Sequence, residues 1–252
     1  MEALYKSLLK QILENGKLKS NRTDTKALSL FALNLDFNIA KQFPLLTSKF
    51  IDFNIIETEF QWFINGQTNT DYFKERGIKI WDAWADKDGN LGPVYGFQML
   101  NFNGKNYNQL KALIKSLKEN PNTRRHIISL WNPLQLHEMA LPPCYLYFQF
   151  YVDNNDLNLF VVQRSGDMFA GVPYDIGLFS YFLIYVANQV NLQPANISLK
   201  IVDAHIYENH IDGVKEYLCK TEFDLPTWTF ENNKLSINNY KHHSKIKIKI
   251  AI

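Results

Sequence analysis

Cys144 has the sequence context that most favours nucleophilic chemistry. It follows two prolines and begins an apolar stretch that predicts a strand over residues 145–152. A second strand is predicted over residues 157–163, and an Asp-Asn-Asn-Asp turn joins the two as a hairpin. Cys144 and Arg164 should then lie side by side at the open end, where a guanidinium can stabilise a thiolate and bind an anion. The alternative is a buried cysteine that only packs.

Four arginines in predicted loops could bind a phosphate group. Arg124 and Arg125 are adjacent and follow an Asn-Pro-Asn-Thr turn, whereas Arg22 and Arg164 lie in two other polar segments. Each guanidinium offers paired donors that match phosphate oxygens. The alternatives are solvated charges and an ion pair between Arg164 and Asp167. Only the folded chain can show whether the arginines converge.

Glu59 and several aromatic residues are further candidates for a binding site. Glu59 is predicted on an apolar helix, where burial would raise the pKa of its carboxyl group and allow proton transfer near neutrality. A glutamate on the helix surface is the alternative. Trp81 and Trp84 could fill the core or stack against a flat ligand. His205 and Tyr207 could hydrogen-bond a sugar hydroxyl or simply pack.

The overall composition indicates a folded protein with a sizeable core. Hydrophobic residues make up 46% of the 252 residues, and the net charge of +2 excludes a polybasic nucleic-acid binder. Two cysteines cannot form a disulfide framework, and they indicate a reducing compartment. We found no secretory signal and no apolar run of membrane-spanning length, so we expect a cytoplasmic protein. The histidines lack the spacing of metal ligands, and no phosphate-binding or dinucleotide-binding glycine motif is present.

The elements that must position these residues mix helix and strand irregularly, which predicts one α/β domain over residues 1–252. Helices are expected over residues 3–14, 52–65, 110–117, 174–190 and 205–218. Strands are expected over residues 33–37, 126–131, 145–152, 157–163 and 197–202. Lys and Ile alternate over residues 245–250, so one face of this tail should be apolar.

Ordered motifs from about Asn21 to Ile252 resemble the thymidylate synthase family and the related deoxypyrimidine-monophosphate hydroxymethylases. The resemblance implies an α/β (α+β) fold with a large bent mixed sheet packed by helices, acting as a homodimer. The motifs are Arg22-Thr23-x-Thr25, Phe43-Pro44-Leu45-Leu46-Thr47-Ser48-Lys49, Glu59-x-x-Trp62-Phe63-x-x-Gly66, Ile80-Trp81-Asp82-x-Trp84-Ala85, Leu91-Gly92-Pro93-Val94-Tyr95-Gly96-x-Gln98, Arg124-Arg125, Pro143-Cys144, Gln163-Arg164-Ser165-x-Asp167 and Asp203-Ala204-His205-Ile206-Tyr207.

The resemblance also implies a reaction and a role for each site residue. Cys144 would attack C6 of a pyrimidine deoxynucleotide 5′-monophosphate, and 5,10-methylenetetrahydrofolate would donate one carbon to C5. No metal, membrane or nucleic-acid partner is expected. Glu59 and Tyr95 would transfer protons, and the phosphate would be bound by Arg22, Arg164 and Ser165, with Arg124 and Arg125 from the partner chain. The base and sugar would be bound by Gln163, Tyr145, Asp175, His205 and Tyr207. The folate would be bound by Lys49, Trp81, Trp84, Asp167 and Ala251.

Two departures from the family pattern affect the edge of the base. Tyr145 replaces a histidine, and Asp175 replaces the asparagine that reads uracil. That amide accepts from N3–H and donates to O4, whereas an ionised carboxylate can only accept. Cytosine presents an amino donor at N4. The two changes therefore favour dCMP as the substrate and give Asp175 a catalytic role as well.

Three points remain open from the sequence. An ordinary thymidylate synthase that acts on dUMP is one alternative, and a non-catalytic relative that binds nucleotide or RNA is another. The joint presence of Cys144, Glu59 and Tyr95 counts against the non-catalytic reading. Retained tryptophans and an apolar tail favour methyl transfer because they would exclude water, whereas Ala170 and Asp175 favour a hydroxymethyl product.

Overall fold

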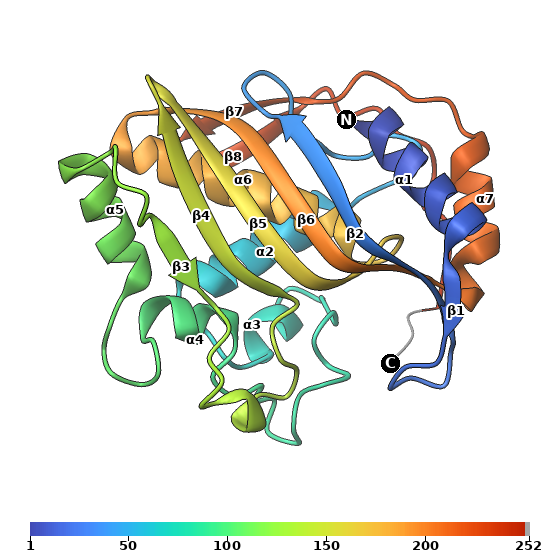
Figure 1. Ribbon diagram of the computed structural model, residues 1–252, viewed down its shortest axis with the longest axis horizontal. Helices are drawn as coiled ribbons and strands as arrows, with labels where there is room; N and C mark the ends of the chain where they lie inside the picture. Colours follow the sequence, from blue (N-terminus) through green and yellow to red (C-terminus); the bar gives the residue numbers. More distant parts are fainter. Residues whose placement is uncertain (250–252) are drawn as a thin grey trace.

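A twisted six-stranded sheet forms the centre of the computed structural model, which describes residues 1–249 (Figure 1). Its strand order is β1 (Lys17–Lys19), β2 (Ala27–Asn38), β6 (Gln193–Tyr207), β5 (Asp156–Asp167), β4 (Tyr145–Asp153) and β3 (Ile127–Ser129). Only β5 and β6 are parallel, and the other neighbours are antiparallel. The expectation of a large mixed sheet in an α/β fold is confirmed.

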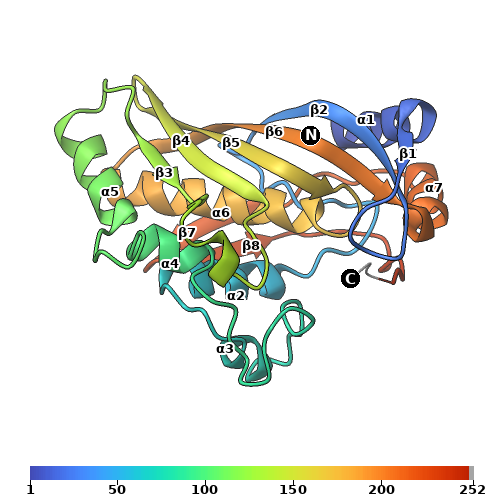
Figure 2. The same cartoon turned by 60° about the horizontal axis from the view of Figure 1, so that its bottom comes forward.

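Two long helices cover one face of this sheet. Figure 2 shows α6 (Val172–Val190) and α2 (Phe53–Ile64) on the same side, and no described element covers the other side. Most of α6 is buried, because its apolar side chains occupy nearly the whole helix circumference. The other elements are α1 (Glu2–Asn15), α3 (Asp71–Lys74), α4 (Tyr95–Leu100), α5 (Gln109–Glu119), α7 (Ile211–Cys219), two 3-10 turns at Leu136–Glu138 and Glu208–His210, and the hairpin β7 (Thr227–Glu231) and β8 (Lys234–Asn238).

Successive side chains of β4 point alternately into the core and toward the uncovered face of the sheet. Phe148 and Phe150 are buried toward α6, where both contact the ring of Phe182. Tyr151 points the other way and is 65% exposed. The uncovered face therefore carries exposed apolar side chains, which are typical of a surface that meets a partner.

Several predicted elements differ from the observed ones. The predicted helix over residues 205–218 is wrong, because residues 205–207 end β6 and α7 begins only at Ile211. Pairing with β2 extends β6 through these residues. The predicted hairpin is confirmed, with Asp153 opposite Asp156. The elements β1, α3, α4 and the β7–β8 hairpin were not predicted.

The C-terminal segment 241–249, here called the tail segment, has no regular secondary structure. Its alternation still appears in burial, because Ile246 is buried while Lys245 and Lys247 are exposed. Ile250 lies outside the described residues. Among residues 1–249, no helix is long and apolar enough to cross a bilayer. The single-domain organisation and the cytoplasmic location remain predictions.

Candidate active site

The sheet topology brings the predicted site residues to one end of the sheet. β4 starts beside the end of β5, β5 runs parallel to β6, and β6 ends beside the start of β2. The starts of β4 and β2 and the ends of β5 and β6 therefore meet at one place, although they are far apart in sequence. The residues paired there are Tyr145 with Gln163, Ser165 with Asp203, Asp167 with His205, and Ala27 with Tyr207.

Arg164 fixes the backbone around Cys144. The Arg164 amide donates to the Cys144 carbonyl at 2.7 Å, which confirms that the two lie side by side. The guanidinium of Arg164 donates to the carbonyls of Pro143 at 2.9 Å and Pro142 at 2.8 Å. The Cys144 amide donates to the hydroxyl of Tyr95 at 2.9 Å. The cysteine is therefore held from both sides by groups of the proposed site.

The Cys144 thiol is protonated near neutral pH in this arrangement. Burial raises the pKa of the thiol above its ordinary value, and Arg164 and Arg22 only partly oppose that effect. The sequence predicted that an arginine would lower the pKa, and its contribution has that direction, but burial outweighs it. Cys219 is exposed at the end of α7 and lies outside the cluster.

Glu59 and Asp175 form the acid–base part of the cluster. Burial, with a contribution from Asp175, raises the pKa of Glu59 to about 8, although the Trp81 indole donates to its carboxyl group at 3.0 Å. Burial also raises the pKa of Asp175 to about 7. The Gln163 amide donates to Asp175 at 2.7 Å, while Gln163 Oε1 is buried without a partner among the described residues. Both carboxyl groups can thus gain and lose protons near neutrality.

Tyr145 lies in the wall between this carboxyl pair and the core. Only 3% of it is exposed, and its ring centroid is 4.6 Å from that of Tyr95 and 5.0 Å from that of Phe179. Burial raises the pKa of the Tyr145 hydroxyl well above its ordinary value, so the hydroxyl stays neutral. Its contact with a base remains a prediction.

The arginines do not all converge within one chain. Arg22 is exposed in the turn before β2, and its charge acts on both Cys144 and Tyr207. Arg124 and Arg125 are exposed just before β3, which is the opposite edge strand of the sheet. The start of β3 pairs with the middle of β4, where Ile127 lies opposite Gln149, and not with the first residue of β4 next to Cys144. The predicted contribution of Arg124 and Arg125 to a partner's site is compatible with this position and remains a prediction.

His205 and Tyr207 line the side of the cluster nearest β2. The His205 Nδ1 atom is 3.2 Å from the Asp203 carbonyl, and the two rings meet edge to face with centroids 5.1 Å apart. Both side chains are half-buried at the end of β6. Each therefore keeps a polar group near solvent that could bind a sugar hydroxyl.

Two of the residues predicted to bind folate, Lys49 and Asp167, meet at the loop after β5. Lys49 is buried and donates to the Phe169 carbonyl, and burial lowers the pKa of its ammonium group to about 8. Asp167 accepts from the amides of Phe169 at 2.9 Å and Ala170 at 3.0 Å. These contacts leave Asp167 partly exposed, with 16% of its side chain accessible.

The two tryptophans differ in how deeply they are buried in the core. Trp81 is 7% exposed and stacks near Trp62, with ring centroids 5.9 Å apart. Trp84 is half-buried beside it, and its buried Nε1 atom has no partner among the described residues. A role for either tryptophan in binding folate remains a prediction. Ala251 lies outside the described residues.

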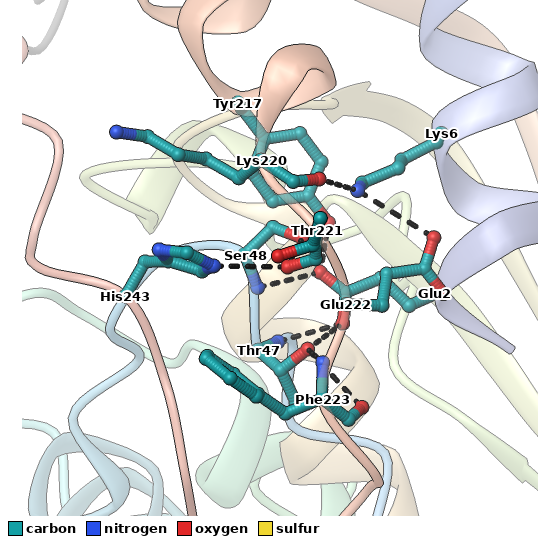
Figure 3. Close-up of polar contacts among 10 residues, drawn as sticks. All are labelled: Glu2, Lys6, Thr47, Ser48, Tyr217, Lys220, Thr221, Glu222, Phe223 and His243. Carbon is teal, nitrogen blue, oxygen red and sulfur yellow. Dashed lines mark hydrogen bonds and ion pairs between the residues drawn. The ribbon is translucent and has the colours of Figure 1, made fainter.

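A buried network that no sequence pattern predicted supports Lys49. Glu2 accepts from the Thr47 amide at 2.7 Å, the Thr47 hydroxyl at 2.6 Å, the Ser48 amide at 2.8 Å and the Tyr217 hydroxyl at 2.7 Å (Figure 3). These donors come from a loop and from α7, and they surround a carboxylate on α1. The network fixes the two residues immediately before Lys49.

Comparison with known proteins identifies the family. The family described as "Thymidylate synthase" matches residues 3–252 of the chain. A thymidylate synthase from Mycoplasma genitalium is 38% identical over 286 aligned positions, which cover 98% of this chain and 99% of the relative. The chain belongs to the thymidylate synthase family. Its members are transferases of nucleotide biosynthesis that use 5,10-methylenetetrahydrofolate as the one-carbon donor and bind a nucleotide.

The family assignment agrees with the motifs from which the resemblance was inferred. It does not test the role of any single residue. Within residues 1–249, no group of three His, Cys, Asp or Glu side chains is placed to hold a metal ion.

Proposed function

We propose that this thymidylate synthase family member transfers a one-carbon unit to C5 of a pyrimidine deoxynucleotide 5′-monophosphate and prefers dCMP. The observation that carries the base preference is Asp175. Its carboxyl group is buried, has a pKa of about 7, and accepts a 2.7 Å hydrogen bond from Gln163. It replaces the amide by which the family reads uracil.

The two protonation states of Asp175 differ in the bases they accept. An ionised carboxylate accepts from the N4 amino group of cytosine, and a proton shared with N3 completes a second bond. The same carboxylate would oppose the lone pairs of O4 in uracil. Cytosine thus tolerates both states of a group that titrates near neutrality, whereas uracil requires the neutral state.

The remaining residues supply nucleophilic attack and proton transfer. Cys144 adds to C6, which makes C5 nucleophilic, and Arg164 holds the backbone that aims the thiol. Methylenetetrahydrofolate, when bound, supplies the carbon that C5 takes up. Tyr95 lies beside the nucleophile, and Tyr95 and Glu59 exchange protons with the base, Glu59 through a carboxyl group whose pKa is about 8.

Conversion of dUMP to dTMP is the second candidate, and two observations favour it. The Mycoplasma genitalium relative is itself named a thymidylate synthase. A neutral Asp175 also presents one donor and one acceptor, as an amide does. The two candidates therefore differ in the protonation state of one carboxyl group.

The chemical outcome at C5 follows from access of water. Exclusion of water by Trp81 and Trp84, whose rings contact each other, would favour hydride transfer and a methyl product. Ala170 belongs to the loop that Asp167 organises, and its small side chain would leave room beside a bound folate. We retain methyl transfer as the preferred outcome and hydroxymethylation as its competitor.

The decisive assay offers dUMP, dCMP and CMP separately with methylenetetrahydrofolate. We expect dCMP to react fastest, and mass spectrometry distinguishes a product heavier by CH₂ from one heavier by CH₂O. Dihydrofolate should appear by absorbance only in the first case. A strong preference for dUMP would overturn the dCMP assignment and leave the family reaction intact. A lack of turnover with all three nucleotides would contradict catalysis itself.

The proposed assembly is a homodimer in which the partner's Arg124 and Arg125 complete the phosphate site. The uncovered sheet face carries Tyr151, Phe160 and Ile127, which are 65%, 37% and 46% exposed. An apolar face of this kind suits contact with a second copy.

Shared sites can be tested by mixing inactive chains. Arg125→Ala and Cys144→Ala proteins should each be inactive alone. A mixed dimer should recover activity, because one of its two sites contains both intact residues. Refolding each variant alone is the control, and a mixture that stays inactive would contradict sharing.

A further inference from the structure

His210 lies between the loop after β5 and the tail segment. Its ring is fully buried at the end of the 3-10 turn that precedes α7. The Nε2 atom is 2.9 Å from the Lys249 carbonyl, to which Asn209 also donates at 2.7 Å. The Nδ1 atom is 3.6 Å from a carboxylate oxygen of Asp167 and has no hydrogen-bond partner among the described residues.

Both neighbours of this ring are acceptors. A carbonyl can only accept, so Nε2 must carry a hydrogen. In a neutral ring Nδ1 would then present its lone pair to the Asp167 carboxylate, which is unfavourable. A charged imidazolium instead presents hydrogen to both neighbours. The 3.6 Å contact with Asp167 is too long for a hydrogen bond and acts as an ion pair.

The groups around the ring favour the charged form on balance. Burial alone would lower the pKa of His210, and the nearby Lys49 ammonium acts in the same direction. Asp167 and the Lys249 carbonyl oppose both, so the pKa lies above its ordinary value. The Tyr207 ring, which packs edge-on at 5.7 Å, is neutral.

The two segments that His210 joins are already packed together. Asp167 orders the amides of Phe169 and Ala170, and the Phe169 carbonyl receives the Lys49 ammonium. The tail segment lies over Gly213 of α7, where an added Cβ would come within 3.3 Å of both Ile246 and Ile248 and 2.9 Å of Phe169. A side chain at Gly213 would therefore separate the tail segment from the loop.

We propose that His210 is a positioning residue whose charged ring latches the tail segment at Lys249 to Asp167. The latch holds Lys249, two positions before Ala251 in the sequence, and keeps Asp167 oriented at the same time. The link to folate rests on the proposed function, which uses methylenetetrahydrofolate, and on the predicted role of Asp167 and Ala251 in binding it. The latch itself stands on the contacts of His210 alone.

Trypsin can report the latch directly because the tail segment carries exposed lysines. Two variants form a matched pair. His210→Gln keeps an amide donor that can reach the Lys249 carbonyl, whereas His210→Asn is too short to do so. Loss of a hydrogen bond to a charged donor should raise tail opening, and hence cleavage after Lys247, by about tenfold in the Asn variant. The Gln variant should remain within about threefold of wild type.

The charge of His210 allows a second test, the pH dependence of cleavage. This test compares only wild type and His210→Gln, which both keep a donor to the Lys249 carbonyl. The latch of wild type weakens as the pH rises through the folded pKa of His210, because deprotonation leaves an Nδ1 lone pair facing the Asp167 carboxylate. The uncharged Gln variant does not titrate at this position. Cleavage of wild type relative to the Gln variant should therefore increase from pH 6 to pH 9, with trypsin's own pH dependence cancelling in the ratio.

The outcomes separate the latch from the reaction. Equal cleavage of wild type and His210→Asn, or a pH-independent ratio to His210→Gln, would overturn the latch. If His210→Asn does not fold, the pH series decides. In the active enzyme the Asn variant should raise KM for methylenetetrahydrofolate about tenfold with little change in KM for the nucleotide. An inactive wild type would reject the proposed function and leave the proteolysis result valid.

Discussion

Two buried carboxyl groups in this protein behave in opposite ways. Glu2 is 2% exposed and Glu59 is 9% exposed, so both are removed from water. Four donors surround Glu2 and lower the pKa of its carboxyl group although burial alone would raise it. Glu59 has one indole donor and lies near Asp175, and its pKa rises to about 8. At Glu2 the four donors outweigh burial, whereas at Glu59 burial and the nearby Asp175 outweigh the single donor.

The difference separates a structural region from a chemical one. The Glu2 region holds a permanent charge that ties α1 to the loop before Lys49 and to α7. The region at the strand ends holds protons on Glu59 and Asp175 that can be exchanged near neutral pH. Changes in the first region should reduce stability, and changes in the second should reduce turnover.

The strongest test of this division is Cys144→Ala. No other group in the strand-end cluster can add to C6, so turnover should fall on the order of 10⁵-fold or more. The melting temperature should change little, since a half-buried thiol contributes modestly to packing. Cys219→Ala is the matched control and should retain nearly full activity. A near-wild-type rate for Cys144→Ala would remove the nucleophile from the mechanism.

Asp175→Asn should change which base is preferred. A site that pairs buried polar groups can discriminate by up to about 10⁴-fold when one partner is lost. We expect the ratio of kcat/KM for dUMP to that for dCMP to rise by up to this factor. Competition between the two nucleotides in one reaction measures the ratio, with exposed Asp71→Asn as the control. An unchanged ratio would show that Asp175 does not read the base.

Glu2→Gln should affect stability and leave base preference unchanged. The amide nitrogen of Gln would face donors that now point at a carboxylate oxygen, at a cost of about 3 kcal/mol. Chemical denaturation measures the free energy of unfolding, and Glu14→Gln on the exposed face of α1 is the control. A stable Glu2→Gln protein would mean that the four hydrogen bonds contribute little net energy.

The pH dependence of stability should show both regions with opposite signs. The stability from Glu2, whose folded pKa is lowered, is present above its ordinary value of 4.5 and lost as the pH falls through the folded pKa. Glu59, whose folded pKa is raised, contributes stability below 4.5 that is lost progressively as the pH rises to about 8. Glu59→Gln should therefore flatten the decline between pH 5 and pH 8 by about 1 kcal/mol per pH unit. The same slope in wild type and variant would argue against a raised pKa.

The sequence by itself determined the local features of the site. Two stretches rich in aromatic and β-branched residues on either side of a polar turn predicted the β4–β5 hairpin, and the hairpin alone places Cys144 beside Arg164. The apolar periodicity of residues 52–65 predicted α2 and put Glu59 among aromatic side chains. The ordered motifs identified the family because each is a short run of residues that can be read without the fold.

The tertiary structure decided what depends on contacts between distant residues. The predicted helix over residues 205–218 failed because pairing with β2 and β5 extends β6 through His205 and Tyr207. Glu2 meets Tyr217 across 215 positions, and His210 meets Lys249 across 39. No local pattern records such contacts, because the stabilising donor or acceptor is supplied by a segment whose position only the packed sheet and helices define.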